Sequence, residues 1–211
     1  MHNILKTYFG YTEFRPLQKE IITNILNRKD TLVLMPTGGG KSLCYQIPAL
    51  MLEGITLVVS PLISLMKDQV SALKNMGVSA AYVNHSLSSE QIRLVLRNIQ
   101  QQKYKIVYIA PERLLTESFL AAISNLKIAM VAVDEAHCIS QWGQDFRPSY
   151  LRIADFLKLL KTRPIVYTGG GSTFQILRKG YGGLKDVIHI SKKEWRTKSV
   201  VDMQKIETLG P

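Results

Sequence analysis

The chain has 211 residues, 46% of them hydrophobic, which is enough to bury a core and form one large domain. No apolar run approaches the length of a membrane span, and the first residues lack the apolar region of a signal peptide, so we expect a cytoplasmic protein with no membrane partner. The net charge of +11 favours a polyanionic partner such as nucleic acid, although a generally basic protein would carry the same charge.

Short β-rich apolar runs alternate with longer helical patterns, as in a parallel sheet with crossover helices. The expected strands are Thr31–Met35, Thr56–Ser60, Ala80–Val83, Ile106–Ala110, Ile128–Val133 and Ile165–Tyr167. The expected helices are Pro16–Asn27, Lys41–Leu52, Leu62–Asn75, ended by Gly77, then Ser89–Gln101, capped by Ser88 or Ser89, and Ser149–Leu160. The predicted fold class is α/β: an open, mainly parallel sheet with helices on both faces and ligands at the carboxyl ends of its strands.

A glycine-rich segment, Met35-Pro36-Thr37-Gly38-Gly39-Gly40-Lys41-Ser42, joins the first strand to the next helix. Its glycines let backbone NH groups point at a polyphosphate, Lys41 supplies a cation for the β and γ phosphates, and Ser42 offers a hydroxyl to Mg²⁺. Met35 stands where the strict phosphate-loop pattern has glycine, and a plain glycine-rich turn is the alternative. The candidate nucleotide-binding residues of this segment are Thr37, Gly38, Gly39, Gly40, Lys41 and Ser42.

Asp134-Glu135-Ala136-His137 stands at the end of the apolar run Ile128–Val133. We expect Asp134 to hold the same Mg²⁺ from the next strand and Glu135 to orient or deprotonate an attacking water. An acidic strand terminus is the alternative for this motif alone, but the two motifs together are what a nucleotide-driven motor needs. The sequence therefore predicts ATP and Mg²⁺ as cofactors, with Ser42 and Asp134 as metal ligands and Lys41, Asp134 and Glu135 as catalytic groups.

These motifs resemble the first motor domain of RecQ-type, superfamily 2 DNA helicases, with a RecA-like fold of the P-loop NTPase class. Six stretches within residues 7–166 carry the resemblance. Phe9-Gly10 and Phe14-Arg15-Pro16-Leu17-Gln18 look like the adenine-recognition motif of the family, and the amide of Gln18 can donate and accept at once. The resemblance implies nucleotide contacts for Phe9, Arg15 and Gln18 and adds His137 of the Asp-Glu-Ala-His box to the catalytic residues.

Three further stretches resemble segments of the family that contact DNA: residues 60–70, residues 110–114 and the loop that follows the acidic box. Without the resemblance, the first is a capped helix start and the second an ordinary strand-to-helix turn. The third, residues 138–148, is the most specific match and resembles an aromatic-rich loop that senses single-stranded DNA and relays this to the ATP site. The resemblance implies DNA contacts for Ser60, Pro61, Gln141, Trp142, Phe146 and Arg147.

The aromatic-rich loop also has a physical rationale and two departures from the family. Trp142 and Phe146 offer stacking faces for bases, and Arg147 can pair with phosphate or stack, whereas two core aromatics are the alternative. The family usually has histidine at position 144 and an acid at position 149, where this chain has Gln144 and Ser149. We expect these changes to weaken coupling between DNA and ATP.

After Val166 the chain departs from the family, which continues with a Thr-Ala-Thr motif that links hydrolysis to strand separation. We predict a RecA-like ATP-binding domain over 1–166, an inserted or replaced segment over 167–196, and a remnant of the helix that follows the missing motif over 197–211. The sequence holds no second motor domain, whose arginines supply much of the rate in this class of NTPase. We therefore expect a truncated product that binds ATP and is a poor motor alone.

Three functions remain open. The first is the ATP-hydrolysing motor domain of a RecQ-like 3′–5′ DNA helicase acting on single-stranded or partly duplex DNA. The second, an RNA-directed superfamily 2 ATPase, would share the nucleotide motifs but not residues 141–147. The third is a non-catalytic, basic nucleic-acid-binding fragment with a vestigial ATP site. The sequence leaves the oligomeric state open.

Overall fold

A parallel sheet forms the centre of the protein. The computed structural model describes residues 1–35, 38–139, 147–160, 165–169 and 200–202. Within them the strand order is β3-β4-β2-β5-β6-β1-β7. The strands are β1 (Thr31–Leu34), β2 (Ile55–Val59), β3 (Ala80–Val83), β4 (Ile106–Ile109), β5 (Ile128–Val133), β6 (Ile165–Gly169) and β7 (Val200–Asp202). Strands β1 to β6 pair in parallel and β7 pairs antiparallel with β1, which confirms the predicted α/β fold.

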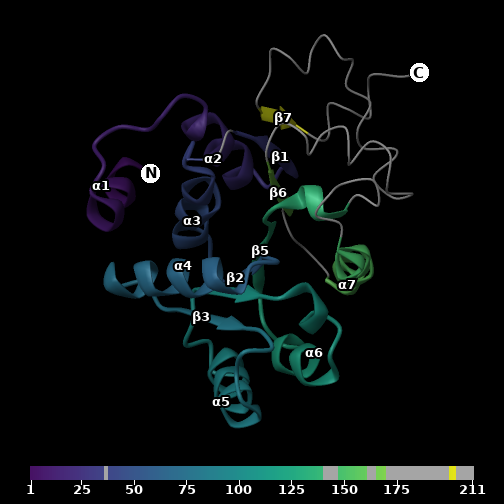
Figure 1. Ribbon diagram of the computed structural model, residues 1–211. Coiled ribbons are helices and arrows are strands. Elements are labelled where there is room, and N and C mark those ends of the chain that lie inside the picture. The colour runs from purple at the N-terminus through teal and green to yellow at the C-terminus, as the bar shows by residue number, and fades with distance from the viewer. Residues whose placement is uncertain (36–37, 140–146, 161–164, 170–199, 203–211) are drawn as a thin grey trace, which may run out of the picture.

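Helices cover both faces of the sheet (Figure 1). They are α1 (His2–Phe9), α2 (Gln18–Leu26), α3 (Lys41–Met51), α4 (Ile63–Asn75), α5 (Ser89–Gln100), α6 (Glu117–Ile123) and α7 (Ile153–Leu159), with 3₁₀ helices η1 (Pro111–Arg113), η2 (Ala136–Ile139) and η3 (Pro148–Arg152). One core contains residues of α2, α3 and α4, and the other contains residues of α5, α6 and α7. Among the described residues, no helix is long and apolar enough to cross a membrane.

The two cores follow from the alternation of side chains along each strand. In β4, Val107 and Ile109 belong to the core with α5, α6 and α7, whereas Ile106 and Tyr108 belong to the core with α2, α3 and α4. All four side chains are buried, because helices cover both faces. A strand buried on both faces needs apolar residues at every position, which explains why the strands appear in the sequence as unbroken apolar runs.

The predicted elements are confirmed with small changes at their ends. All six predicted strands are present, and Ser88 caps α5: the backbone NH of Gln91 donates to Ser88 Oγ (3.2 Å) and the backbone NH of Ser88 donates to Gln91 Oε1 (2.9 Å). The single helix predicted over Ser149–Leu160 is wrong in its first part, which is the 3₁₀ helix η3. This tighter turn begins at Pro148 and places Tyr150 in the core.

Sequence patterns missed three elements. Helices α1 and α6 are short, with eight and seven residues, so neither spans enough turns for a clear helical period. Val200–Asp202 forms strand β7 inside the range predicted as a helical remnant, and this part of the prediction is wrong because the β-branched pair Val200-Val201 extends the sheet beside β1. The predicted inserted segment lies outside the described residues except for the end of β6.

The turn into β2 yields a test of the fold. Gly54 has a φ of +104°, and a Cβ built there would lie 2.3 Å from the carbonyl oxygen of Lys127. Gly77 also has a positive φ, +79°, but its Cβ would meet nothing within 4 Å. We expect Gly77→Ala to lower the free energy of unfolding by about 1 to 2 kcal/mol, the cost of the left-handed conformation alone. Gly54→Ala should cost at least twice as much in urea denaturation, and equal losses would contradict the close approach to Lys127.

Candidate functional site

The ends of three neighbouring strands lie level at one edge of the sheet. The backbone NH of Asp134 donates to the carbonyl of Val59 (2.8 Å), that of Ser60 to Ile109 (3.1 Å) and that of Ala110 to Val83 (3.0 Å). These bonds continue the ladders one residue beyond β5, β2 and β4. The acidic motif and the segments after Ser60 and Ala110 therefore meet at the carboxyl edge, as predicted.

The glycine-rich segment follows β1 at the same edge, but it is not on the strand next to Asp134. Strand β6 lies between β1 and β5, with Tyr167 paired with Val133 and Gly169 paired with Leu34. The expectation of adjacent strands is wrong because the chain leaves β5 and returns through β6 before the sheet is complete. The order of strands in a parallel sheet is set by these crossovers, which the local sequence does not encode.

The start of α2 supports the glycine-rich loop. The buried side chain of Gln18, 1% exposed, donates from Nε2 to the carbonyl of Gly40 (3.1 Å) and accepts at Oε1 from the backbone NH of Arg15 (3.0 Å). The guanidinium of Arg15 donates to the carbonyl of Gly38. Gly40 has a φ of +84°, and a Cβ there would lie 2.4 Å from Gln18 Nε2. The loop backbone is thus held from one side by two residues of the predicted adenine motif, whose contact with a base stays a prediction.

Lys41 lies over the loop at the N-terminus of α3. Its Nζ donates to the carbonyl of Met35 (3.2 Å). The Lys41 side chain therefore reaches from the end of the loop at α3 back to the residue at which the loop begins. The first backbone NH groups of α3 have no partner within the helix and point out of its N-terminus, which is the positive end of the helix dipole. A phosphate at this helix end would meet both the NH groups and the Lys41 ammonium. Pro36 and the predicted residue Thr37 lie outside the described residues.

The acidic motif forms a tight turn whose backbone is tied down. Asp134 is 7% exposed, and its Oδ1 accepts from the backbone NH of Glu135 (3.0 Å). Glu135 is half-buried with a φ of +48°, in the left-handed region that non-glycine residues rarely adopt. The hydroxyl of Tyr150 donates to the carbonyl of Asp134 (2.8 Å). The side chain of His137 lies outside the described part of the chain.

Two buried tyrosines, Tyr45 and Tyr108, lie within electrostatic range of the Asp134 carboxylate. Burial, followed by the nearby Tyr108 and Asp134, raises the pKa of Tyr45 well above 10, and Ser42 opposes this. Burial raises the pKa of Tyr108 to about 12, and the Asp134 carboxylate adds to this. Both phenols therefore stay protonated at physiological pH. Tyr45 lies close to both predicted metal ligands, Ser42 and Asp134.

One buried carboxylate and one hydroxyl fit an ion that arrives with a nucleotide. In the described residues, no group of three or more His, Cys, Asp or Glu side chains is placed to hold a metal ion by itself. Mg²⁺ typically takes one or two carboxylates from the protein and completes its octahedron with phosphate oxygens and waters. Ser42 and Asp134 match that requirement.

The predicted DNA-contact residues are only partly on the surface. Ser60, 1% exposed, and Pro61 are buried, whereas Leu62 is 42% exposed and Arg147 is exposed. The guanidinium of Arg147 donates to the carbonyl of Pro61 (3.0 Å), and its backbone NH donates to Cys138 (3.0 Å). Arg147 thus joins the base of the aromatic-rich loop to the segment after β2. Gln141, Trp142 and Phe146 lie outside the described residues.

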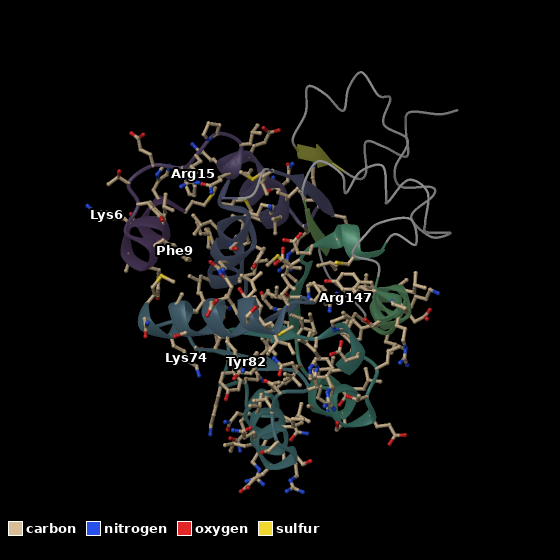
Figure 2. All side chains as sticks on the ribbon, in the orientation of Figure 1. Lys6, Phe9, Arg15, Lys74, Tyr82 and Arg147 are labelled. Carbon is tan, nitrogen blue, oxygen red and sulfur yellow. The ribbon has the colours of Figure 1, made fainter. Side chains whose placement is uncertain are left out.

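Figure 2 shows that the two labelled arginines of the site are far apart on the molecule. Arg15 lies near the start of α2 and the glycine-rich loop, whereas Arg147 lies beside α7. The glycine-rich loop and Arg147 therefore lie at different parts of the carboxyl edge. In the strand order, the acidic motif after β5 lies between the glycine-rich loop after β1 and the segment after β2 that Arg147 contacts.

Sequence patterns gave no indication of the role of Tyr150 or of the buried tyrosines near Asp134. An apolar segment that contains a tyrosine predicts only a core position, since the direction of its hydroxyl depends on the tertiary fold. Likewise, no motif predicts that the Arg15 guanidinium bonds to the loop backbone. The spacing of Arg15 and Gln18 before the loop was the available signal.

Comparisons with known proteins show the family to which the chain belongs. The family model for the DEAD/DEAH box helicase matches residues 15–172. The chain is 50% identical over 165 residues to the ATP-dependent DNA helicase RecQ of Bacillus subtilis, which covers 78% of this chain and 28% of that protein. The RecQ protein of Haemophilus influenzae is 49% identical over 164 residues, covering 78% and 26%. The resemblance to RecQ helicases is confirmed, and the chain spans about a quarter of the length of these relatives.

Solved structures support the fold alone. A DUF1998 helicase, MrfA, bound to DNA and AMPPNP, matches with a TM-score of 0.62 at 18% identity, covering 81% of this chain and 26% of that one. A hypothetical ATP-dependent RNA helicase from Sulfolobus tokodaii matches with a TM-score of 0.63 at 21% identity, covering 89% and 60%. The RecA-like helicase fold is thereby confirmed.

Lys41 provides a test of the phosphate-binding end of α3. We expect Lys41→Ala to abolish binding of Mg²⁺-ATP in calorimetry, because the ammonium is the side-chain cation over the loop. The fold should persist, since the lysine contacts a backbone carbonyl and belongs to neither core. Lys74→Ala, an exposed lysine in the last turn of α4, is the matched control and should bind like the parent. Equal affinity in all three proteins would rule out the loop as the phosphate site.

Proposed function

The chain belongs to the DEAD/DEAH box helicase family, and from this premise we propose that it is the ATP-binding and ATP-hydrolysing first motor domain of a RecQ-like 3′–5′ DNA helicase. One observation carries the proposal. The loop before α3 and the buried Asp134 share the carboxyl edge of the sheet, with strand β6 between β1 and β5. This arrangement suits a nucleotide whose phosphates lie on α3 and whose metal ion faces β5.

Each residue has a distinct role in the proposed hydrolysis. Lys41 and the first NH groups of α3 bind the β and γ phosphates and offset their charge. Ser42 and Asp134 hold Mg²⁺, which when bound neutralises charge on the phosphates. Glu135 orients the attacking water and accepts its proton. Gln18 and Arg15 keep the loop backbone in position from the opposite side.

The proposed DNA surface begins beside Leu62 and Arg147. Leu62 is exposed at the start of α4. The guanidinium of Arg147 donates to the carbonyl of Pro61, the residue before Leu62. An exposed apolar side chain beside an arginine suits a single strand, which offers sugars and base faces next to phosphates. The resemblance to the aromatic-rich loop adds Gln141, Trp142 and Phe146 to the proposed DNA contacts.

ATP hydrolysis with and without nucleic acid tests this function. We expect single-stranded DNA to stimulate whatever hydrolysis the chain performs, and RNA of the same sequence to stimulate it less. RNA-selective stimulation would favour an RNA-directed ATPase. Tight DNA binding without nucleotide binding would favour a non-catalytic binding protein. In either case the proposal would be wrong.

Glu135→Gln separates binding from chemistry. Glutamine has the same shape and can still orient water, but it cannot take the proton, so we expect nearly unchanged Mg²⁺-ATP affinity and loss of hydrolysis. A phosphate-release assay beside calorimetry measures both quantities. Turnover equal to that of the parent would mean that Glu135 has a structural role only.

Trp142 tests the DNA surface. In a Trp195→Phe background, which leaves one indole, adding a single-stranded oligonucleotide should change the fluorescence of Trp142. Trp142→Ala should cost roughly 1 to 3 kcal/mol of DNA affinity if one base stacks on the ring, with Mg²⁺-ATP affinity nearly unaffected. A variant that unfolds while the parent keeps its fluorescence on adding DNA would show that the ring is part of the core.

A further inference from the structure

A buried hydroxyl outside the motifs is bonded to the acidic turn. Tyr150 is 0% exposed, and its hydroxyl donates to the carbonyl of Asp134 at 2.8 Å. Phenylalanine would fill the same space without the hydroxyl, and a buried hydroxyl is costly unless it is bonded. The hydroxyl therefore has its stabilising role at that carbonyl, which belongs to the peptide between Asp134 and Glu135.

That peptide controls the direction of both proposed catalytic carboxylates. Glu135 has a φ of +48°, and its backbone NH donates to Oδ1 of Asp134 (3.0 Å). The peptide is thus fixed at its NH by the Asp134 side chain and at its carbonyl by Tyr150. Loss of the second bond removes one restraint on this peptide, and a left-handed residue in a turn has an alternative with a negative φ that is lower in local energy.

Tyr150 is also one turn away from the surface arginine. Its backbone NH donates to the carbonyl of Arg147 (2.9 Å) across the 3₁₀ helix η3. The guanidinium of Arg147 donates to Pro61 (3.0 Å), and its backbone NH donates to Cys138 (3.0 Å) at the end of the acidic motif. Four residues, 147–150, therefore contact the Asp134 carbonyl at one end and the segment after β2 at the other.

The hydroxyl remains a donor at all physiological pH values. Burial raises the pKa of Tyr150 well above its usual range, and Cys138, Asp134 and Glu135 add to this while Arg147 opposes it. The groups that face the phenol are therefore those of the acidic turn and the surface arginine.

We propose that Tyr150 is a positioning residue that fixes the Asp134–Glu135 peptide through its hydroxyl and transmits to it the position of Arg147, which a nucleic-acid phosphate can draw away from the Pro61 carbonyl. This inference rests on the proposed function, since it takes Asp134 and Glu135 as the residues that hold and hydrolyse ATP. It assigns the link between the two sites to a side chain outside the aromatic-rich loop.

The test measures how a single strand changes nucleotide affinity in the full chain. Calorimetry gives the Kd of Mg²⁺-AMPPNP, which is not hydrolysed, with and without a saturating thymidine oligonucleotide. We expect the two values to differ roughly fivefold or more in the parent, the usual lower range of coupling between sites. In Tyr150→Phe the ratio should fall to within about twofold of one, with Kd in the absence of DNA less affected.

Tyr108→Phe is the matched control. Tyr108 is also buried and lies near Asp134, but its hydroxyl bonds to Gln46 (3.1 Å) and Tyr45 (3.4 Å) instead of the acidic turn. The Tyr108→Phe variant should therefore lose stability but keep the parental ratio of the two Kd values for Mg²⁺-AMPPNP. Arg147→Ala tests the other end at saturating oligonucleotide and is safe for folding because the residue is exposed. It should reduce the ratio as Tyr150→Phe does.

The outcomes separate the inference from the function on which it rests. A parent that binds no AMPPNP refutes the proposed function. A parent that binds it with a ratio of one, or a Tyr150→Phe variant with an unchanged ratio, refutes the inference and leaves the nucleotide site in place. If Tyr150→Phe fails to fold, the Arg147→Ala ratio decides, and a parental ratio there overturns the link.

Discussion

The parallel register of β2, β4 and β5 is the constraint on which the rest of this protein depends. These strands run in one direction and are buried on both faces. Their register makes the backbone ladders end at one level, and the residue that follows each strand, Ser60, Ala110 or Asp134, donates the next bond of the ladder. A shift of one residue would turn every core side chain to the opposite face. The same register that packs the core therefore sets the height of Asp134 relative to the segment after β2.

Several polar side chains at this edge are buried with hydrogen-bond partners in the backbone or beside neutral side chains. Asp134 accepts from the NH of Glu135, Gln18 bonds at both ends of its amide, and the tyrosines near Asp134 stay uncharged. A buried carboxylate without a cation is costly. A metal ion that arrives with a nucleotide would add positive charge beside the buried Asp134 carboxylate, so the burial of Asp134 favours a cationic ligand.

The sequence predicted what depends on local pattern. Unbroken apolar runs gave all six parallel strands, and the Ser88 cap gave the start of α5. It failed where distant segments decide: β6 enters between β1 and β5, β7 pairs with the edge of β1, and Pro148 tightens η3. In the site, the residue types of the phosphate loop and acidic box were recognisable, whereas the partners of Gln18 and Tyr150 depend on packing between elements far apart in the chain.

The two proposed sites are held by different kinds of contact, and this difference bears on how they communicate. The nucleotide loop is supported by Arg15 and Gln18 at the start of α2, whose side chains donate to the carbonyls of Gly38 and Gly40. The DNA side is supported by η3, whose residues pack in the other core, across the sheet. Both sets of contacts end on backbone at the carboxyl edge, where the acidic turn after β5 lies between the glycine-rich loop after β1 and the segment after β2 in the strand order. A sheet this well buried transmits little by bending, so a signal between the two faces passes through the turns at its edge.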